Sequence, residues 1–168
     1  MMLKAVIFDV DGTLAETEEV HREAFNVVFE QSGLGWYWSP ELYRELLKVT
    51  GGKERIRHFT LSEGITGISD EDIASLHRLK TTRYAELLPQ SVELRPGVER
   101  LIDECLSRSI RLAIATTTTE ANVEALDQAV GGALKLSQFE AIVGAVTVPE
   151  KKPSPQVYEV ALAKLGLK

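Results

Sequence analysis

The chain has 168 residues, of which 44% are hydrophobic and 26% are charged, a balance typical of a folded globular protein. No apolar run approaches the roughly 20 residues that a membrane-spanning helix needs, which argues against a membrane protein. The net charge of −6 argues against a broad nucleic-acid surface but is compatible with a local site for a small anion. The single cysteine, Cys105, and the absence of a secretory signal predict a cytoplasmic protein.

The first half of the chain reads as one strand followed by helices. The apolar run of residues 3–9 is typical of a strand buried on both faces of a parallel sheet. Beyond it, the spacing of apolar residues predicts only helices up to about residue 90. The last of them is expected to face the core with Ile73, Leu76, Leu79 and Leu87. Residues that cap helices or suit a first turn mark the helix starts: Thr17, Ser39, Pro40 and Ser69.

From residue 91 onward the pattern alternates between helices and strands. A helix after Arg95-Pro96-Gly97 leads to strands near 112–115 and 139–145, each followed by a further helix. This order predicts an α/β fold with a Rossmann-like parallel sheet and right-handed crossovers. We expect the core to comprise residues 1–15 and 91–168, with residues 16–90 forming an inserted all-helical domain.

Two aspartates follow the first strand, in the segment Asp9-Val10-Asp11-Gly12-Thr13. Ligands of open α/β sheets bind beyond the carboxyl ends of the strands, and alternation points Asp9 and Asp11 in the same direction. Two carboxylates ~4 Å apart repel by ~4 kcal/mol at an effective dielectric near ~20, so a cation or a proton is required between them. Oxygen ligands suit Mg²⁺, and an acidic turn without function is the alternative.

This segment resembles the DxDGT motif of the haloacid dehalogenase (HAD) superfamily of phosphotransferases. The resemblance implies that Asp9 attacks a phosphoryl group and forms an aspartyl phosphate. It also implies that Asp11 protonates the leaving oxygen and later deprotonates the water that hydrolyses this intermediate. Mg²⁺ would be held by the Asp9 carboxylate and the Asp11 backbone carbonyl, and a nearby lysine would help to mask charge.

Two further segments are predicted to bind the reacting phosphate. The second strand ends at Thr116-Thr117, just before a helix whose N–H groups and dipole favour an anion. In the HAD pattern the Thr116 hydroxyl is the phosphate ligand, and Thr117 would contribute its backbone N–H, while Thr118 or Thr119 caps the helix. Lys152 lies in a Lys-Pro-x-Pro loop and, by the same resemblance, balances the charge of nucleophile and phosphate.

The neighbours of Lys152 are expected to matter less. Lys151 is predicted to be a charge at the surface or at the entrance of the site. Relatives often carry aspartate after the second proline of this motif, whereas this chain has Gln156. We expect a small effect, because that position lies beyond the predicted phosphate contact.

The helical insertion resembles the cap of the phosphoglucomutase-like branch of the HAD family. Thr17 and His21 share one helical face, and their counterparts in that branch contact the general acid or the substrate. Burial of His21 at the domain junction is an alternative of equal weight. Glu18 would accept hydrogen bonds from sugar hydroxyls, or it is only a first-turn acid favoured by the helix dipole. Lys80 matches a cap lysine of the branch but is expected to be solvated.

The segment Thr50-Gly51-Gly52-Lys53-Glu54-Arg55 is the most distinctive part of the insertion. Cationic side chains and exposed N–H groups after a Gly-Gly break would clamp a second phosphate, involving Gly51, Gly52, Lys53 and Arg55. A helix start with solvated charges is the alternative. The segment resembles the CbbY type, whose substrate is xylulose 1,5-bisphosphate, and the likeness extends to FDVDGTLAETEE, LRPGV, ATTT and EKKPSP. Residues 36–38 are expected to pack within the cap.

A fourth HAD motif, an acidic pair that completes the metal site, follows a further strand in the family. The sequence ends in the helix predicted for residues 156–165 and supplies no such pair. Either the chain is a portion of a longer protein, or its core is truncated at the C-terminal end and the edge of the first strand is left exposed to aggregation or strand exchange.

The function predicted from these patterns is that of a Mg²⁺-dependent phosphatase for a small sugar phosphate, in particular a pentulose bisphosphate. The alternatives are a hexose-phosphate mutase similar to β-phosphoglucomutase and a catalytically weak phosphate-binding fragment. Neither a nucleic acid nor a membrane is an expected partner, and the chain is expected to be a monomer if it is complete.

Overall fold

A computed structural model describes residues 3–167, which form two compact units. The described residues up to Thr17 and those from Leu88 onward make up the core unit, and Glu18–Leu87 makes up the cap unit. The sequence places the helical insertion at residues 16–90, so the cap unit is slightly shorter than that prediction at both ends.

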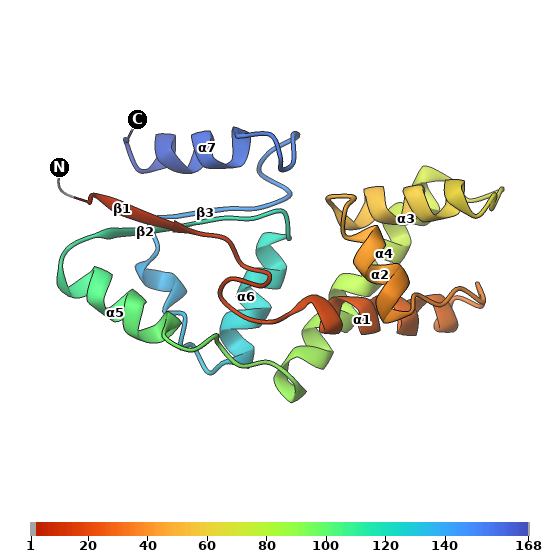
Figure 1. The fold of residues 1–168 in the computed structure, drawn as a ribbon, viewed down its shortest axis with the longest axis horizontal. Coiled ribbons are helices and arrows are strands. Elements are labelled where there is room, and N and C mark those ends of the chain that lie inside the picture. Colours follow the sequence, from red (N-terminus) through yellow and green to blue (C-terminus); the bar gives the residue numbers. More distant parts are fainter. Residues whose placement is uncertain (1–2, 168) are drawn as a thin grey trace. The chain divides into compact units, whose positions relative to one another are not determined.

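Three parallel strands form the sheet of the core unit (Figure 1). They are β1 (Ala5–Phe8), β2 (Arg111–Ala115) and β3 (Ala141–Val143), in the spatial order β1-β2-β3. The helices of this unit are α5 (Val98–Ser107), α6 (Glu120–Ala129) and α7 (Gln156–Lys164), with short 3₁₀ turns η1 (Leu88–Gln90) and η2 (Leu136–Gln138). The predicted α/β fold with a parallel sheet is confirmed.

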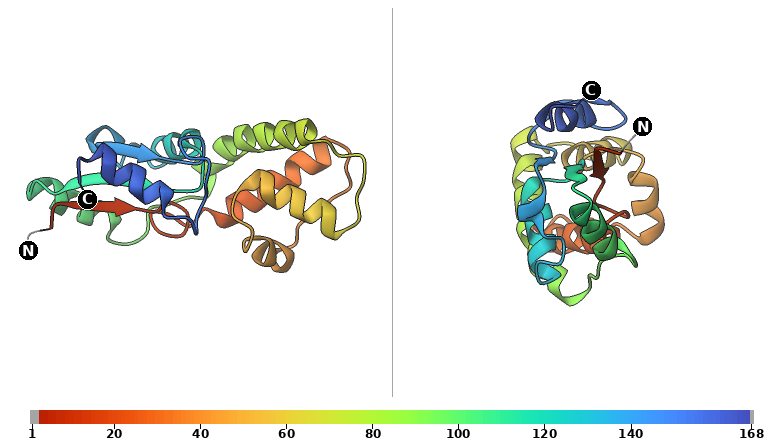
Figure 2. Two further views of the ribbon diagram at one scale, coloured as in Figure 1. Left: turned by 90° about the horizontal axis from the view of Figure 1, so that it is seen from above. Right: turned by 90° about the vertical axis from the view of Figure 1, so that its left-hand side faces the viewer.

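Helices cover both faces of this sheet. Helices α5 and α6 lie on one face and α7 lies on the other (Figures 1 and 2). Right-handed crossovers between strands that are neighbours both in sequence and in space require α5 and α6 to share a face. Small side chains on the opposite face, including Ala113, Ala115 and Ala141, allow α7 to approach closely through Val157, Ala161 and Leu165.

Strand β1 is less buried than its sequence suggests. Within residues 3–167 its only strand partner is β2, so its other edge is unpaired. Phe8 is buried, whereas Ala5, Val6 and Ile7 are only half-buried. The expectation of a strand buried on both faces therefore does not hold for most of β1 among the described residues, which instead show the exposed edge that the sequence predicts as one alternative.

The cap unit consists of four helices: α1 (Glu18–Gln31), α2 (Pro40–Leu46), α3 (Gly52–Ser62) and α4 (Asp70–Leu87). Its core is an aromatic cluster in which Trp38 is fully buried and packs against Phe25, Phe29 and Phe59. Trp36 packs against the same cluster. The expected packing of residues 36–38 holds for both tryptophans, but the Tyr37 side chain is 65% exposed.

Helix α4 presents the face that the sequence suggests to the cap core, with one exception. Leu79 is 52% exposed, so its predicted inward position is wrong. The predicted inward positions Ile73, Leu76 and Leu87 are buried, and Lys80 and Tyr84 complete the buried face at helical spacing. None of the helices described, including this one of 18 residues, is long and apolar enough to cross a membrane.

Candidate active site

Asp9 and Thr116 lie at the same edge of the sheet. Phe8 pairs with Ile114 in the parallel register of β1 and β2, so the residues that follow each strand emerge side by side. Thr116 is 1% exposed, and its backbone N–H donates to the carbonyl of Val143 at 3.0 Å. The sheet topology therefore gathers the predicted nucleophile and the predicted phosphate ligand at the carboxyl ends of the strands.

Lys152 contacts the predicted nucleophile directly. Its Nζ donates to Asp9 Oδ1 at 2.8 Å, although the two residues are 143 positions apart in the chain. Burial alone would lower the pKa of Lys152, but hydrogen bonds to Asp9 and Tyr158 outweigh burial and raise it. The ammonium also lies 5.0 Å from the centre of the Tyr158 ring. Lys152 therefore stays positively charged beside Asp9 at neutral pH.

Asp11 is held in a tight turn that follows β1. The Thr17 hydroxyl donates to Asp11 Oδ1, so Thr17 serves Asp11 in addition to preceding α1, where the sequence predicts a helix cap. The Gly12 N–H donates to the carbonyl of Ala15 at 2.8 Å, and Gly12 has a φ of +72°. A left-handed backbone favours glycine, which explains why the chain can turn directly after Asp11.

The threonine run places donors ahead of α6. The Thr118 backbone N–H donates to Thr116 Oγ1 at 3.2 Å, which leaves the Thr116 hydroxyl proton available to a ligand. Thr119 is the helix cap, and its Oγ1 accepts from the Asn122 backbone N–H at 3.3 Å. Thr117 stands between them, half-buried, at the N-terminal end of the helix. This arrangement suits an anion.

Glu120 was missed by the sequence reasoning as a component of this site. Its Oε1 accepts from the Gly144 backbone N–H at 3.1 Å and from the Thr147 hydroxyl at 2.5 Å. Burial raises the pKa of Glu120, but these hydrogen bonds outweigh it and lower the pKa. A Cβ on Gly144 would lie 2.8 Å from the Thr118 carbonyl oxygen, so glycine is needed there. Glu120 thus ties the threonine loop to the loop that carries Lys152.

Gln156 closes the loop around Lys152. Its Oε1 accepts from the Glu150 backbone N–H at 2.9 Å, and the Ser154 hydroxyl donates to Glu150 Oε2 at 2.9 Å. Glutamine at the position where relatives often carry aspartate therefore stabilises the loop. Lys151 is half-buried, and its predicted place at the surface or at the entrance of the site stays a prediction.

The metal ligands implied by the family are the Asp9 carboxylate and the Asp11 backbone carbonyl. Residues 3–167 contain no group of three or more His, Cys, Asp or Glu side chains that could hold a metal ion. Mg²⁺ keeps several waters and commonly binds one or two carboxylates together with substrate phosphate. Because both protein donors are oxygen atoms at the open end of the sheet, they fit such a sparsely ligated magnesium.

In the cap unit, Arg55 makes internal contacts. Its Nε donates to the Leu46 carbonyl at 3.1 Å, and its Nη1 donates to the Tyr43 hydroxyl at 2.9 Å. The Tyr43 hydroxyl in turn lies 3.4 Å from Glu18 Oε2, which is long for a hydrogen bond between oxygens. Arg55 therefore joins α2 to α3 in this structure, and its predicted phosphate contact would require these bonds to rearrange.

The glycines before Arg55 shape the start of α3. Gly51 precedes the helix with a φ of +97°, and a Cβ on Gly52 would lie 2.5 Å from the His77 ring. Lys53 is exposed. Of the cationic residues predicted to clamp a second phosphate, Lys53 is therefore the one that solvent reaches most readily.

His21 is buried inside the cap unit. It is 6% exposed, stacks on Tyr84 with ring centres 4.0 Å apart, and has Nδ1 2.5 Å from Lys80 Nζ. Lys80 is 4% exposed, and its ammonium lies 4.9 Å from the ring centres of both Phe25 and Tyr84. The expectation that Lys80 is solvated is wrong, because aromatic faces and the imidazole surround its charge.

Comparison with known proteins identifies the family. The family of haloacid dehalogenase-like hydrolases matches residues 6–168. The chain belongs to this family. It is therefore a HAD-type hydrolase of the phosphatase class, as the sequence predicts.

The similarity to proteins of the CbbY type covers nearly the whole chain. Protein CbbY of Rhodobacter capsulatus is 55% identical over 99% of this chain and 74% of its own length. Protein CbbY of Cereibacter sphaeroides is 49% identical over 99% of this chain and 72% of its own length. A mutant CbbY from Rhodobacter sphaeroides, solved with xylulose-(1,5)bisphosphate, matches with a TM-score of 0.90 at 46% identity, over 99% of this chain and 74% of that one. The predicted resemblance and fold are thereby confirmed.

Proposed function

We propose that this hydrolase removes a phosphate group from a small phosphorylated sugar, and that a pentulose bisphosphate is its substrate. The observation that carries the proposal is the Lys152–Asp9 contact at the end of β1, where a carboxylate and a charged ammonium meet beside a threonine loop. The choice of sugar is supported by the solved CbbY relative with xylulose-(1,5)bisphosphate.

In the first step, an Asp9 carboxylate oxygen attacks phosphorus and forms a new P–O bond. The bond between phosphorus and the sugar oxygen breaks, and the leaving oxygen takes its electron pair together with a proton from Asp11. Lys152, the Thr116 hydroxyl and the Thr117 backbone N–H stabilise the charge on the transferring group. Sugar alcohol leaves, and an aspartyl phosphate remains on Asp9.

In the second step, water attacks the same phosphorus while the Asp11 carboxylate accepts a proton from it. The bond between phosphorus and the Asp9 oxygen breaks, which regenerates the carboxylate and releases inorganic phosphate. The Thr17 hydroxyl, bound to Asp11 Oδ1, orients Asp11 for both proton transfers. Mg²⁺, held by the Asp9 carboxylate and the Asp11 backbone carbonyl, would neutralise negative charge on the phosphate when bound.

For the second phosphate of a bisphosphate we propose the exposed Lys53 and the N–H groups at the start of α3, with Gly51 and Gly52 shaping that turn. Arg55 contributes indirectly, through its hydrogen bond to the Tyr43 hydroxyl. Glu18, next to that tyrosine, would accept a hydrogen bond from a sugar hydroxyl. His21 supports the cap fold through its contact with Lys80.

The proposal is tested by phosphate release from a panel of a pentulose bisphosphate, pentose monophosphates and a hexose 1-phosphate. We expect release to be fastest with the bisphosphate and to disappear after chelation of Mg²⁺. A mutase would interconvert hexose phosphate isomers without releasing phosphate. A fragment that only binds phosphate would release none from any substrate, and either outcome would refute the proposal.

A further inference from the structure

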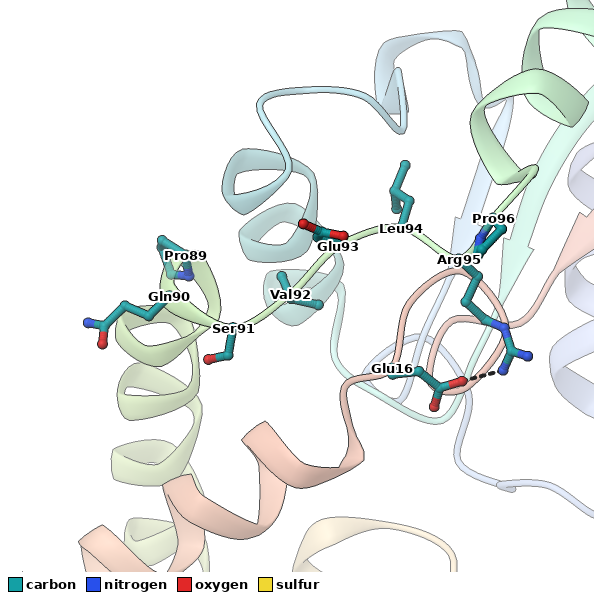
Figure 3. Close-up of a pocket in the computed structure, with 9 residues that line it drawn as sticks. All are labelled: Glu16, Pro89, Gln90, Ser91, Val92, Glu93, Leu94, Arg95 and Pro96. Carbon is teal, nitrogen blue, oxygen red and sulfur yellow. Dashed lines mark hydrogen bonds and ion pairs between the residues drawn. The ribbon is translucent and has the colours of Figure 1, made fainter.

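Arg95 joins the return segment between η1 and α5 to the turn that follows β1. Its Nη1 donates to the Gly12 carbonyl oxygen at 2.7 Å and forms an ion pair with the Glu16 carboxylate. The Arg95 backbone N–H also donates to the Leu14 carbonyl at 2.8 Å. Figure 3 shows the guanidinium turned toward Glu16, beside a pocket of about 600 Å³ lined by Glu16 and residues 89–96.

The contact with Gly12 matters more than the ion pair. The Arg95 and Glu16 side chains are 47% and 70% exposed, and an ion pair that exposed contributes little to stability. The hydrogen bond to the Gly12 carbonyl is charge-assisted and holds the Gly12–Thr13 peptide group, one residue beyond Asp11. Together with the Thr17 hydroxyl on the Asp11 carboxylate, it restrains the turn next to Asp11 as well as the Asp11 side chain.

We propose that Arg95 is a positioning residue that orients Asp11 toward the leaving oxygen by holding the Gly12 carbonyl. The inference rests on the proposed function, in which Asp11 is the general acid. Misplacing an acid by about 1 Å can cost about 100-fold in rate, so a restraint on one peptide group is sufficient to matter. Neither the family motif nor the sequence reasoning gives Arg95 a role.

The test uses aryl phosphates whose leaving groups differ in pKa. The ratio kcat/KM reports only the steps up to departure of the leaving group, and a weakly basic phenolate needs no proton from Asp11. We expect Arg95→Ala to lower kcat/KM at least about 10-fold for sugar phosphates and basic phenols, and less than about twofold for nitrophenyl phosphate. Arg95→Lys should fall between parent and Arg95→Ala.

Two variants serve as controls. Arg100→Ala removes an exposed arginine from the adjacent helix α5 and should match the parent for every leaving group. Glu16→Gln removes the ion pair but keeps the hydrogen bond to Gly12, so it should stay within about twofold of the parent. If Arg95→Ala loses activity equally for all leaving groups, or loses none, the positioning role is wrong.

Amide hydrogen exchange supplies a readout that is independent of activity. The N–H groups of Gly12, Thr13 and Leu14 bond within the turn, and they should exchange faster in Arg95→Ala but not in Glu16→Gln. Unchanged exchange would contradict the proposal. If Arg95→Ala does not fold, Arg95→Gln takes its place in both measurements. A parent chain without any phosphatase activity would refute the proposed function, while the exchange data would still decide whether Arg95 holds the turn.

Discussion

The core unit and the cap unit use their polar side chains in different ways. In the core unit, Lys152 bonds to Asp9 and Arg95 bonds to Gly12, so residues far apart in sequence meet at the open ends of the strands. In the cap unit, Arg55 and His21 bond inside their own helical bundle. A parallel sheet gathers functional groups at one edge by its topology, whereas a small helical unit also needs polar residues to organise itself. A match to a family motif is therefore a better guide to a residue's function in the core unit than in the cap unit.

The largest effect is expected at the nucleophile. Asp9→Asn should lower kcat by a factor of about 10⁴ or more, because the amide can neither attack phosphorus nor pair with Lys152. Steady-state phosphate release measures this. The control, Asp103→Asn, replaces an exposed aspartate on α5 and should retain full activity. Substantial activity in Asp9→Asn would show that Asp9 is not the nucleophile.

The next largest effect separates two adjacent lysines. Lys152→Ala should lower kcat/KM by about 10²–10³-fold, since it removes the charge that stabilises the transferring phosphoryl group. Lys151→Ala should stay within about threefold of the parent, because Lys152 is the lysine whose ammonium donates to Asp9. Equal losses in the two variants would contradict the assignment.

The pH profile checks the same lysine. Because the pKa of Lys152 is raised, its ammonium stays protonated below the ordinary value of about 10.4 and is lost only above it. The parent kcat/KM should therefore show no loss due to Lys152 between pH 7 and about 10. A decline with a midpoint well below that range, absent from Lys152→Arg, would overturn this expectation.

A smaller effect sharpens the description of the cap. Lys53→Ala should raise KM for a bisphosphate about 10-fold, leave KM for a monophosphate unchanged, and leave thermal stability unchanged. Arg55→Ala should instead lower the free energy of unfolding by about 2 kcal/mol, because the hydrogen bonds from Arg55 to the Leu46 carbonyl and the Tyr43 hydroxyl are lost. If Arg55→Ala raised KM for the bisphosphate and Lys53→Ala lowered the stability, Arg55 would be the ligand of the second phosphate and Lys53 would not.

The smallest effect concerns Glu120. Glu120→Gln should lower the free energy of unfolding by about 1 kcal/mol at pH 7, because the charge-assisted bonds to Gly144 and Thr147 weaken. Since the pKa of Glu120 is lowered in the folded state, this stabilisation is present above about pH 4.3 and is lost as pH falls further. Melting curves from pH 3 to 7 should converge at the acid end. Glu124→Gln, exposed on the same helix, should show no such dependence.

Local patterns were sufficient for several features of this chain. The hydrophobic periodicity indicated the α/β core and the helical insertion, and the start of α2 has the Ser39 cap that its sequence indicates. The motif around Asp9 and the family resemblance pointed to the strand ends as the site. These features depend on neighbours within about four residues or on a topology that any parallel sheet shares.

Other features were decided only when distant segments packed together. The packing of α4 within the cap buried Lys80 and left Leu79 exposed. The contacts of Glu120 with Thr147 and of Arg95 with Gly12 join residues 27 and 83 positions apart. No local pattern encodes which partner a charged residue will meet at that separation. The sequence by itself determined where the chemistry resides, and the tertiary structure decided which side chains hold it in place, because those restraints arise from long-range packing.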